Sequence, residues 1–357
     1  IELRDFKTAT AHYQQALNIR EESGEFYKSA GIYHILGRIA QLQRRFQEAI
    51  YFSQKALKIH KDAGDLYKAA YEYHQLADIA REQRQFKEAM AYSTEALKIY
   101  ENLGYLHDAA AEYHQLGNLT YLQEELEEAI NYYHKALKIY EDAEDCYNAA
   151  DEYLQLGTVA ARQQLFDDTF AYYKKALRIF EDTKNWDKAA TVYHQLGMMA
   201  QQQQQFEEAI NYYQKALKIR EEAQDWYKAA DDYSLLGMIA QQQQRFEEAI
   251  HYYQKAFEFY HQFQDWYKTS LPLIGLGNVL EAQLKWTEAI KIYIQSFAID
   301  VEHNQEWIES DLNNLGRMLK QLGESQFDAI WRKFTGKDCA GEVREVIWAA
   351  RDRLEAE

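Results

Sequence analysis

Four histidines recur at one position of a periodic sequence. His34, His74 and His114 are spaced 40 residues apart, and His194 follows after a further 80. Imidazole nitrogens ligate zinc at about 2.0–2.1 Å, so the pattern raises the question of a metal site. If the histidines lie at equivalent points of successive packed helices, they are about 8–10 Å apart, and two rings share an ion only by both reaching inward. The spacing therefore favours a ladder of polar side chains along one wall over a bound metal.

No other pattern in the chain supplies catalytic chemistry. The sequence contains no phosphate-binding loop, no dinucleotide glycine cluster, no H-E-x-x-H and no G-x-S-x-G, and the Thr-Gly-Lys-Asp at residues 335–338 lacks the glycine spacing of a phosphate loop. Cys146 and Cys339 are 193 residues apart at positions that do not correspond, which is neither a disulfide framework nor a metal-ligand spacing. We therefore predict a protein that is not an enzyme, with no catalytic residue, no cofactor and no metal.

Charge and hydropathy exclude two classes of partner. Asp and Glu number 57 against 40 Lys and Arg, which gives a formal net charge of −17. Binding of nucleic acid needs clusters of Lys and Arg side chains, so this charge argues against it. No run approaches the roughly 18–20 apolar residues that cross a bilayer, so we expect neither nucleic acid nor membrane as a partner.

The two isolated cysteines fit a reducing cytoplasm. The chain opens with Ile1 part-way through a repeat, and we expect the array to continue upstream in a longer protein.

The elements that must position these side chains follow from an internal repeat. Residues 226–264 repeat residues 186–224 at an offset of 40, and the same frame extends over most of the chain. We divide the single expected domain into the second helix of a truncated repeat at 1–24, seven full repeats at 25–304, a degenerate eighth repeat at 305–336 and a capping helix at 337–357.

Each repeat reads as two amphipathic helices. The first, helix A, follows an acid or amide such as Asp65 or Asp225 and carries apolar residues at three- and four-residue spacing. The second, helix B, begins near an aromatic residue such as Phe206 and continues with alanines and a tyrosine. With 47% hydrophobic residues and a single proline, the composition predicts an all-α protein. That proline, Pro272, falls within a helix A, which we expect it to bend or to start late.

The repeat resembles a known family. The order Tyr193, Leu196, Gly197, Ala209, Tyr213, Ala216 is similar to the tetratricopeptide repeat (TPR), here lengthened from 34 to 40 residues. The resemblance implies a right-handed α-solenoid of antiparallel helix pairs with a C-terminal capping helix, whose A helices line a concave face. Forty-residue TPR arrays in bacteria often follow a signalling ATPase or a caspase-like protease module, and the resemblance suggests that setting.

Transferring the family's ligand-contact positions gives the candidate binding residues. They form three rows along the A helices, polar and histidine-rich toward the N-terminal end and richer in methionine toward the other. The family's carboxylate clamp for acidic peptide ends needs Lys and Arg beside Asn, and the rows keep only two asparagines. The candidates are His34, Arg38, His74, Asp78, Arg81, His114, Asn118, Tyr121, His194, Met198, Gln201, Met238, Gln241 and Asn278.

These observations predict a non-enzymatic scaffold or sensor module that binds a protein segment in its concave groove. The negative charge favours a partner of basic or mixed polar character. His114, Asn118 and Tyr121 stand at i, i+4 and i+7 of one helix and should present one continuous patch. Two alternatives stay open: an architectural spacer or self-association surface that needs no groove ligand, and an enzyme or small-ligand receptor, for which the chain offers no catalytic group.

Overall fold

The protein consists of consecutive helices. The computed structural model describes residues 6–356, and this part of the chain contains α-helices and one short 3₁₀ helix but no strand. It divides into two compact units, one ending at Thr183 and the other beginning at Lys184. Within each unit every helix packs against the next along the chain, as expected for an α-solenoid of antiparallel pairs, and the all-α prediction is confirmed.

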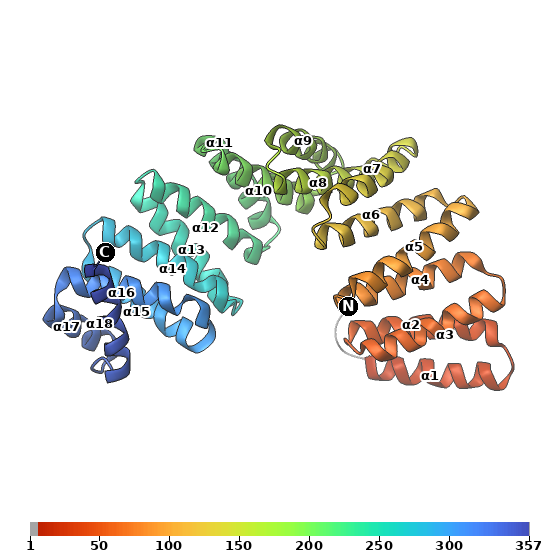
Figure 1. The fold of residues 1–357 in the computed structure, drawn as a ribbon, viewed down its shortest axis with the longest axis horizontal. Coiled ribbons are helices and arrows are strands. Elements are labelled where there is room, and N and C mark those ends of the chain that lie inside the picture. Colours follow the sequence, from red (N-terminus) through yellow and green to blue (C-terminus); the bar gives the residue numbers. More distant parts are fainter. Residues whose placement is uncertain (1–5, 357) are drawn as a thin grey trace. The chain divides into compact units, whose positions relative to one another are not determined.

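The first unit holds nine helices among the described residues, and its helices stack in chain order (Figure 1). The even-numbered helices are the A helices of the sequence repeat and the odd-numbered ones are the B helices. They are α1 (Phe6–Glu22), α2 (Phe26–Leu42), α3 (Phe46–Asp62), α4 (Leu66–Glu82), α5 (Phe86–Leu103), α6 (Leu106–Leu122), α7 (Leu126–Asp142), α8 (Cys146–Arg162) and α9 (Phe166–Asp182).

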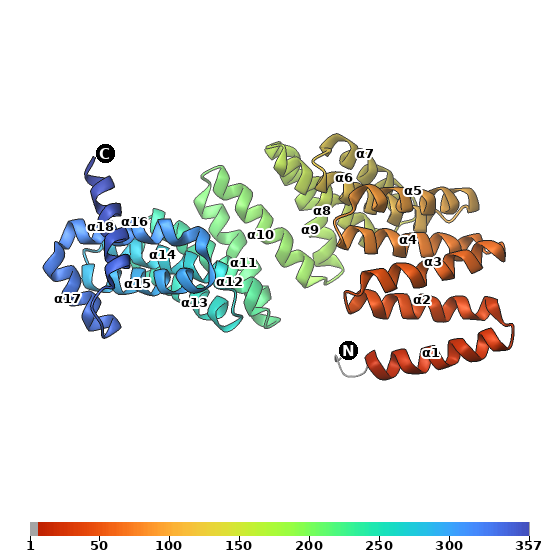
Figure 2. The ribbon, with the colours of Figure 1, turned by 60° about the horizontal axis from the view of Figure 1, so that its bottom comes forward.

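The second unit continues the alternation and ends in three helices that depart from it (Figure 2). Its elements are α10 (Trp186–Gln202), α11 (Phe206–Glu222), α12 (Trp226–Gln242), α13 (Phe246–Gln262), α14 (Trp266–Ala282), α15 (Trp286–His303), η1 (Gln305–Trp307), α16 (Ile308–Leu322), α17 (Glu324–Thr335) and α18 (Gly341–Ala356).

Short polar side chains fix where most A helices begin. The carboxylate of Asp65 accepts a hydrogen bond from the backbone N–H of Lys68, and Asp145, Asn185, Asp225 and Asp265 make the equivalent bond. Each bond satisfies one of the donors that the first turn leaves unpaired. The expectation that Pro272 delays the start of α14 was wrong. The helix begins at Trp266, at the same repeat position as the other A helices, and includes the buried Pro272.

Close approach of the two helices in a repeat depends on glycine facing tyrosine. A Cβ atom built on Gly157 would stand 2.5 Å from the ring of Tyr173, and Gly117, Gly197, Gly237 and Gly277 face a tyrosine in the same way. The tyrosine rings are buried and fill the space that the missing side chain leaves. Two repeats have a small, buried serine in place of the tyrosine: Ser53 faces Gly37, and Ser93 stands at the equivalent position relative to Ala77.

The C-terminal helices form one apolar cluster. Leu315 and Met318 of α16, Phe327 and Trp331 of α17 and Ile347 of α18 are buried together. Helix α18 lies directly on α16, because a Cβ atom on Gly316 would stand only 2.8 Å from the backbone nitrogen of Arg351. The tail therefore covers the apolar side of the last helices, as a terminal cap must in a stack where each repeat packs only on its neighbours.

Two fully buried carboxyl groups meet beside this cluster. Asp300 of α15 accepts a 2.5 Å hydrogen bond from the hydroxyl of Ser270, and Asp311 of α16 interacts with Asp300. Burial, followed by the hydrogen bond with Asp300 and by its charge, raises the pKa of Asp311 to about 8. Burial also raises the pKa of Asp300.

We expect Gly157→Ala to destabilise the protein and Gly37→Ala to be tolerated. Overpacking of a filled core costs about 1–3 kcal/mol, which outweighs the gain in helix propensity from alanine. At Gly37 the nearest atom to a new Cβ is the hydroxyl of Ser53 at 3.0 Å, a small side chain that can move. Urea unfolding of both variants checks the prediction, and equal effects at the two positions would contradict it.

We expect the pH dependence of stability to fall away in Asp311→Asn. The pKa of Asp311 in the folded chain, about 8, exceeds its ordinary value of 3.8, so unfolding releases a proton. The free energy of unfolding should then decrease as the pH rises from about 4 to about 8, and the asparagine variant should lose most of that decrease. Thermal melts across this range test it, with the exposed Asp142→Asn as a control that keeps the wild-type slope.

Candidate functional site

All fourteen candidate residues lie on A helices, in six of the seven full repeats. Arg38, Arg81, Met198 and Met238 are exposed, and the other ten are partly buried. The side of the A helices that carries these residues is called the A-helix face below. The candidates belong to α2 (His34, Arg38), α4 (His74, Asp78, Arg81), α6 (His114, Asn118, Tyr121), α10 (His194, Met198, Gln201), α12 (Met238, Gln241) and α14 (Asn278).

Each histidine of the ladder pairs with a carboxylate on the next A helix. Nδ1 of His74 lies 2.6 Å from Oε1 of Glu112, and Nδ1 of His114 lies 2.7 Å from Oε1 of Glu152. Nδ1 of His34 stands 3.0 Å from Oε1 of Glu72. The histidines are therefore not a bare row of rings. They join α2 to α4, α4 to α6 and α6 to α8.

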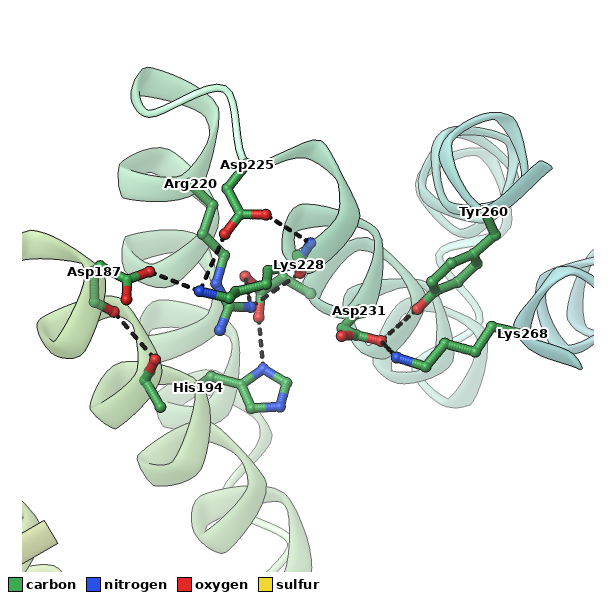
Figure 3. Close-up of polar contacts among 10 residues, drawn as sticks. Asp187, His194, Arg220, Asp225, Lys228, Asp231, Tyr260 and Lys268 are labelled. Atoms are coloured by element: carbon green, nitrogen blue, oxygen red, sulfur yellow. Dashed lines mark hydrogen bonds and ion pairs between the residues drawn. The ribbon is translucent and has the colours of Figure 1, made fainter. Parts of the chain in front are cut away.

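Among residues 184–356 there is one pair of this kind, and an arginine completes it; Figure 3 labels its His194 and Arg220. Nδ1 of His194 lies 2.7 Å from one oxygen of Asp232, and Nη1 of Arg220 donates to the other at 2.7 Å. The same guanidinium donates to the backbone carbonyl of Lys228 at 3.0 Å. Both oxygens of Asp232 are thus paired, and the group is closed by its own chain.

The carboxylates of the first unit are as deeply buried but less completely paired. Glu72, Glu112 and Glu152 are at most 2% exposed, and the Oε2 atom of each accepts no hydrogen bond from any described residue. Burial raises the pKa of Glu152 even though His114 opposes the shift. Burial would lower the pKa of His74, but the hydrogen bond and charge of Glu112 outweigh it and raise that pKa. In each of these pairs the histidine engages one carboxylate oxygen, and the other oxygen lacks a hydrogen bond from the described residues.

The sequence interpretation missed these carboxylates, although the sequence contains a signal for them. An acid follows each ladder histidine by 38 residues: Glu72, Glu112, Glu152 and Asp232. Where the histidine is replaced by Leu154 the residue 38 positions on is Val192, and where it is Ser234 that residue is Pro272. The two positions therefore change together from repeat to repeat, as expected for side chains that meet across neighbouring helices.

One hollow in the first unit gathers five of the candidates. It has a volume of about 430 Å³ and lies between α4, α6 and α8. Tyr121, expected to extend the patch of His114 and Asn118, is not among the lining residues; its ring instead faces the guanidinium of Arg162 at 5.3 Å. The lining residues are His74, Asp78, Arg81, Ala111, His114, Gln115, Asn118, Tyr140, Asn148, Asp151 and Glu152.

A second hollow of about 690 Å³ lies nearer the N-terminal end of the same unit. Tyr27, Tyr67 and Tyr71 supply aromatic walls, Lys28 and Lys68 lie among them, and His34 is the only candidate that lines it. The ammonium of Lys68 contacts the Tyr27 hydroxyl at 2.8 Å.

Several candidates make hydrogen bonds inside their own repeat. The hydroxyl of Tyr133 donates to Asn118 at 2.8 Å, and that of Tyr293 donates to Asn278 at 2.7 Å. Gln201 and Gln241 accept from Tyr213 and Tyr253 in the same way. These four side chains therefore help to hold the buried tyrosines, whether or not they also meet a ligand.

No group of three or more His, Cys, Asp or Glu side chains among residues 6–356 is arranged to hold a metal ion. None of the described helices is both long and apolar enough to span a bilayer.

We expect His74→Leu to destabilise the protein and the added change Glu112→Val to restore much of the loss. Removing the histidine leaves a buried carboxylate without its partner, which costs about 2 kcal/mol or more. Leucine and valine are the residues that the chain itself carries at the corresponding positions 154 and 192. Unfolding of the two single variants and the double variant forms a double-mutant cycle, and simple additivity would show that the two side chains are not coupled.

The solved structures that share this fold include three of particular interest. A Signal Transduction ATPase with Numerous Domains (STAND) protein with a tetratricopeptide repeat sensor, from Pyrococcus horikoshii, matches with a TM-score of 0.67 and 17% identity, over 99% of this chain and 55% of that one. Aspartyl phosphate phosphatase F from Bacillus subtilis matches with 0.58 and 14%, over 95% and 97%. The Rap conjugation gene regulator of plasmid pLS20, in complex with the Phr* peptide, matches with 0.51 and 17%, over 98% and 96%. At these identities the likeness concerns the fold.

Curated protein sequences include no match to the chain. The family model of the tetratricopeptide repeat matches residues 67–142, 148–222, 188–262 and 230–300, which together make up more than half of the chain. These matches cover the helix pairs in which glycine faces tyrosine and three of the four histidine–carboxylate pairs, those of His74, His114 and His194. The chain therefore belongs to the tetratricopeptide repeat family, in a form whose repeat is 40 residues long.

Proposed function

We propose that the protein is a non-enzymatic interaction module that binds a protein segment along its A-helix face, taken to be the concave groove. The observation that carries the proposal is the 430 Å³ hollow, because five residues selected from the sequence as ligand contacts line one cavity. Its lining mixes carboxylates, imidazoles, amides and one guanidinium, a set suited to hydrogen bonding with a polar segment.

The charge of the chain favours a partner of basic or mixed polar character. The formal net charge of −17 attracts cations and repels anionic surfaces, which supports a protein partner over nucleic acid. A likeness in fold to the Rap regulator that was solved with the Phr* peptide is consistent with peptide binding, without identifying the peptide.

The proposed setting is a larger signalling protein of the bacterial cytoplasm. The chain spans about half the length of the Pyrococcus horikoshii protein, which joins a tetratricopeptide repeat sensor to an ATPase. That arrangement supports fusion to an upstream ATPase or protease module. Cys146 and Cys339 are both free thiols, which fits a reducing compartment.

The alternative is an architectural spacer or self-association domain without a groove ligand. Such a protein would need the same apolar packing and the same capping helix, but no ligand would contact its A-helix face. The two functions differ in whether single, exposed side chains of that face affect binding.

A selection of random linear peptides against the protein, followed by fluorescence-anisotropy titration of the recovered peptides, tests the proposal. The groove variant is Arg81→Glu with Tyr121→Ala, because Arg81 is exposed and lines the 430 Å³ hollow, and Tyr121 is a partly buried candidate of α6. We expect it to weaken binding by about 2 kcal/mol, roughly 30-fold, since tyrosine and arginine dominate interface energetics.

The control variant carries the same chemical changes on B helices. Tyr51→Ala and Arg178→Glu alter exposed residues of α3 and α9 and should leave binding within about twofold of the wild type. Loss of binding in this control but not in the groove variant would refute the A-helix face as the site. Failure to recover any peptide, together with concentration-dependent self-association in ultracentrifugation, would favour the spacer.

A further inference from the structure

The two hollows of the first unit occupy equivalent places two repeats apart. Both have a histidine–glutamate pair in their lining, His34 with Glu72 in one and His114 with Glu152 in the other. His60 of α3 in the first hollow corresponds to Tyr140 of α7 in the second, each contributed by a B helix. The residue at the wall is small in both, Gly31 in one and Ala111 in the other. Because the two hollows are built from equivalent positions, differences between their lining residues indicate different ligands.

The differences concern charge. At two further equivalent positions the N-terminal hollow has Lys68 and Tyr71, where the hollow between α4, α6 and α8 has Asn148 and Asp151. The latter is therefore lined by three acids and a single arginine, and it is called the acidic hollow below. The acids are Asp78, Asp151 and Glu152, and the arginine is Arg81.

Glu152 gives the acidic hollow a buried acceptor. Its residue is 1% exposed, its Oε1 is paired with His114, and its Oε2 accepts no hydrogen bond from any described residue. Arg81 is engaged elsewhere, with Oδ1 of Asp78 at 2.8 Å. In the second unit the corresponding carboxylate, Asp232, receives the guanidinium of Arg220 at its other oxygen. The chain thus shows, at one of its own pairs, which group completes such a carboxylate.

We propose that the acidic hollow binds the guanidinium of an arginine side chain supplied by the partner, with Oε2 of Glu152 as its buried acceptor. This inference rests on the proposed function and names the chemistry of the ligand at that face. A guanidinium presents five donors in a plane, so it can meet Glu152 and still donate to amide or carboxylate oxygens at the wall. Release of a buried carboxylate from incomplete pairing is the source of the affinity.

The N-terminal hollow should reject the same group. Three bases line it, Arg20, Lys28 and Lys68, against a single acid, Glu72, so a further cation meets like charge there. A partner segment is therefore expected to place its arginine over α6 and α8 and not over α2 and α4. The difference between the two hollows would therefore fix the orientation of a partner segment along the first unit.

The test uses Nα-acetyl-arginine amide as the probe and the citrulline analogue, equal in shape but uncharged, as its control. Titration followed by amide chemical shifts of the whole chain reports both affinity and location. We expect shifts in α6 and α8, and binding of the citrulline analogue about tenfold weaker, because hydrogen bonds to a buried charge are the strong ones. Equal affinity of the two probes, or shifts confined to other helices, would overturn the proposal.

Three variants locate the acceptor. Glu152→Gln should abolish the preference for arginine, whereas Glu112→Gln, which removes a carboxylate equally buried and equally paired with a histidine but outside the lining of the hollow, should keep it. Asn148→Lys places in the acidic hollow the residue that the chain carries at position 68, and it should block the probe while leaving the melting temperature within a few degrees. If Asn148→Lys leaves arginine binding intact, the acidic hollow is not the site.

The outcome is separate from that of the proposed function. Peptides that lose affinity in the groove variant but show no preference for arginine would retain the A-helix face as a binding site and refute the role of Glu152. Arginine binding that is lost in Glu152→Gln, with no peptide recovered by selection, would retain the acidic hollow and refute recognition of a peptide segment.

Discussion

Close contact between the two helices of each repeat is the constraint on which the rest of the structure depends. A helix in a solenoid can bury its apolar side only against its neighbours, so the distance between neighbours decides how well the core is filled. Here the contact is set by glycine on helix A and a buried tyrosine on helix B, as at Gly157 and Tyr173. The hydroxyls of four such tyrosines donate hydrogen bonds to candidate side chains of the A-helix face. The acceptors are Asn118, Gln201, Gln241 and Asn278. The core and the candidate face are therefore built from the same residues.

Contacts between repeats use a different chemistry. A carboxylate with almost no exposure is unfavourable unless it is paired, and these carboxylates are paired with histidines of the preceding A helix. Such pairs contribute less net stability than an apolar contact of the same size, but losing one partner is costly. The chain uses both solutions, since the corresponding positions 154 and 192 carry leucine and valine. The polar pairs of three successive junctions in the first unit leave a row of three buried carboxyl groups, each with one oxygen that lacks a hydrogen bond from the described residues.

The unpaired oxygens of these carboxyl groups affect both the stability of the fold and the binding proposed above. Glu72, Glu112 and Glu152 each keep one oxygen without a partner among the described residues, while Asp232 has both oxygens paired because Arg220 reaches it. A ligand that donates to such an oxygen removes a cost that the folded chain otherwise bears, so binding and folding should support each other. Under the proposed function, the first unit is the part of the chain in which a basic partner would gain most.

The sequence by itself determined the period, the helix pairs and the family, because those depend on patterns within one repeat: apolar spacing, a capping Asp or Asn, and glycine placed to meet an aromatic ring. It also selected His74, Asp78, Arg81, His114 and Asn118, which the fold brings to one hollow. It did not anticipate the pairing of Glu152 with His114, the separation of Tyr121 from that hollow, or the start of α14 at Trp266 in spite of Pro272. Those features depend on contacts between side chains 38 or more residues apart and on neighbours that hold a helix together against a local preference. Only the tertiary structure could decide them, because pairing across helices is set by the distance and rotation between repeats, which no pattern within a single repeat encodes.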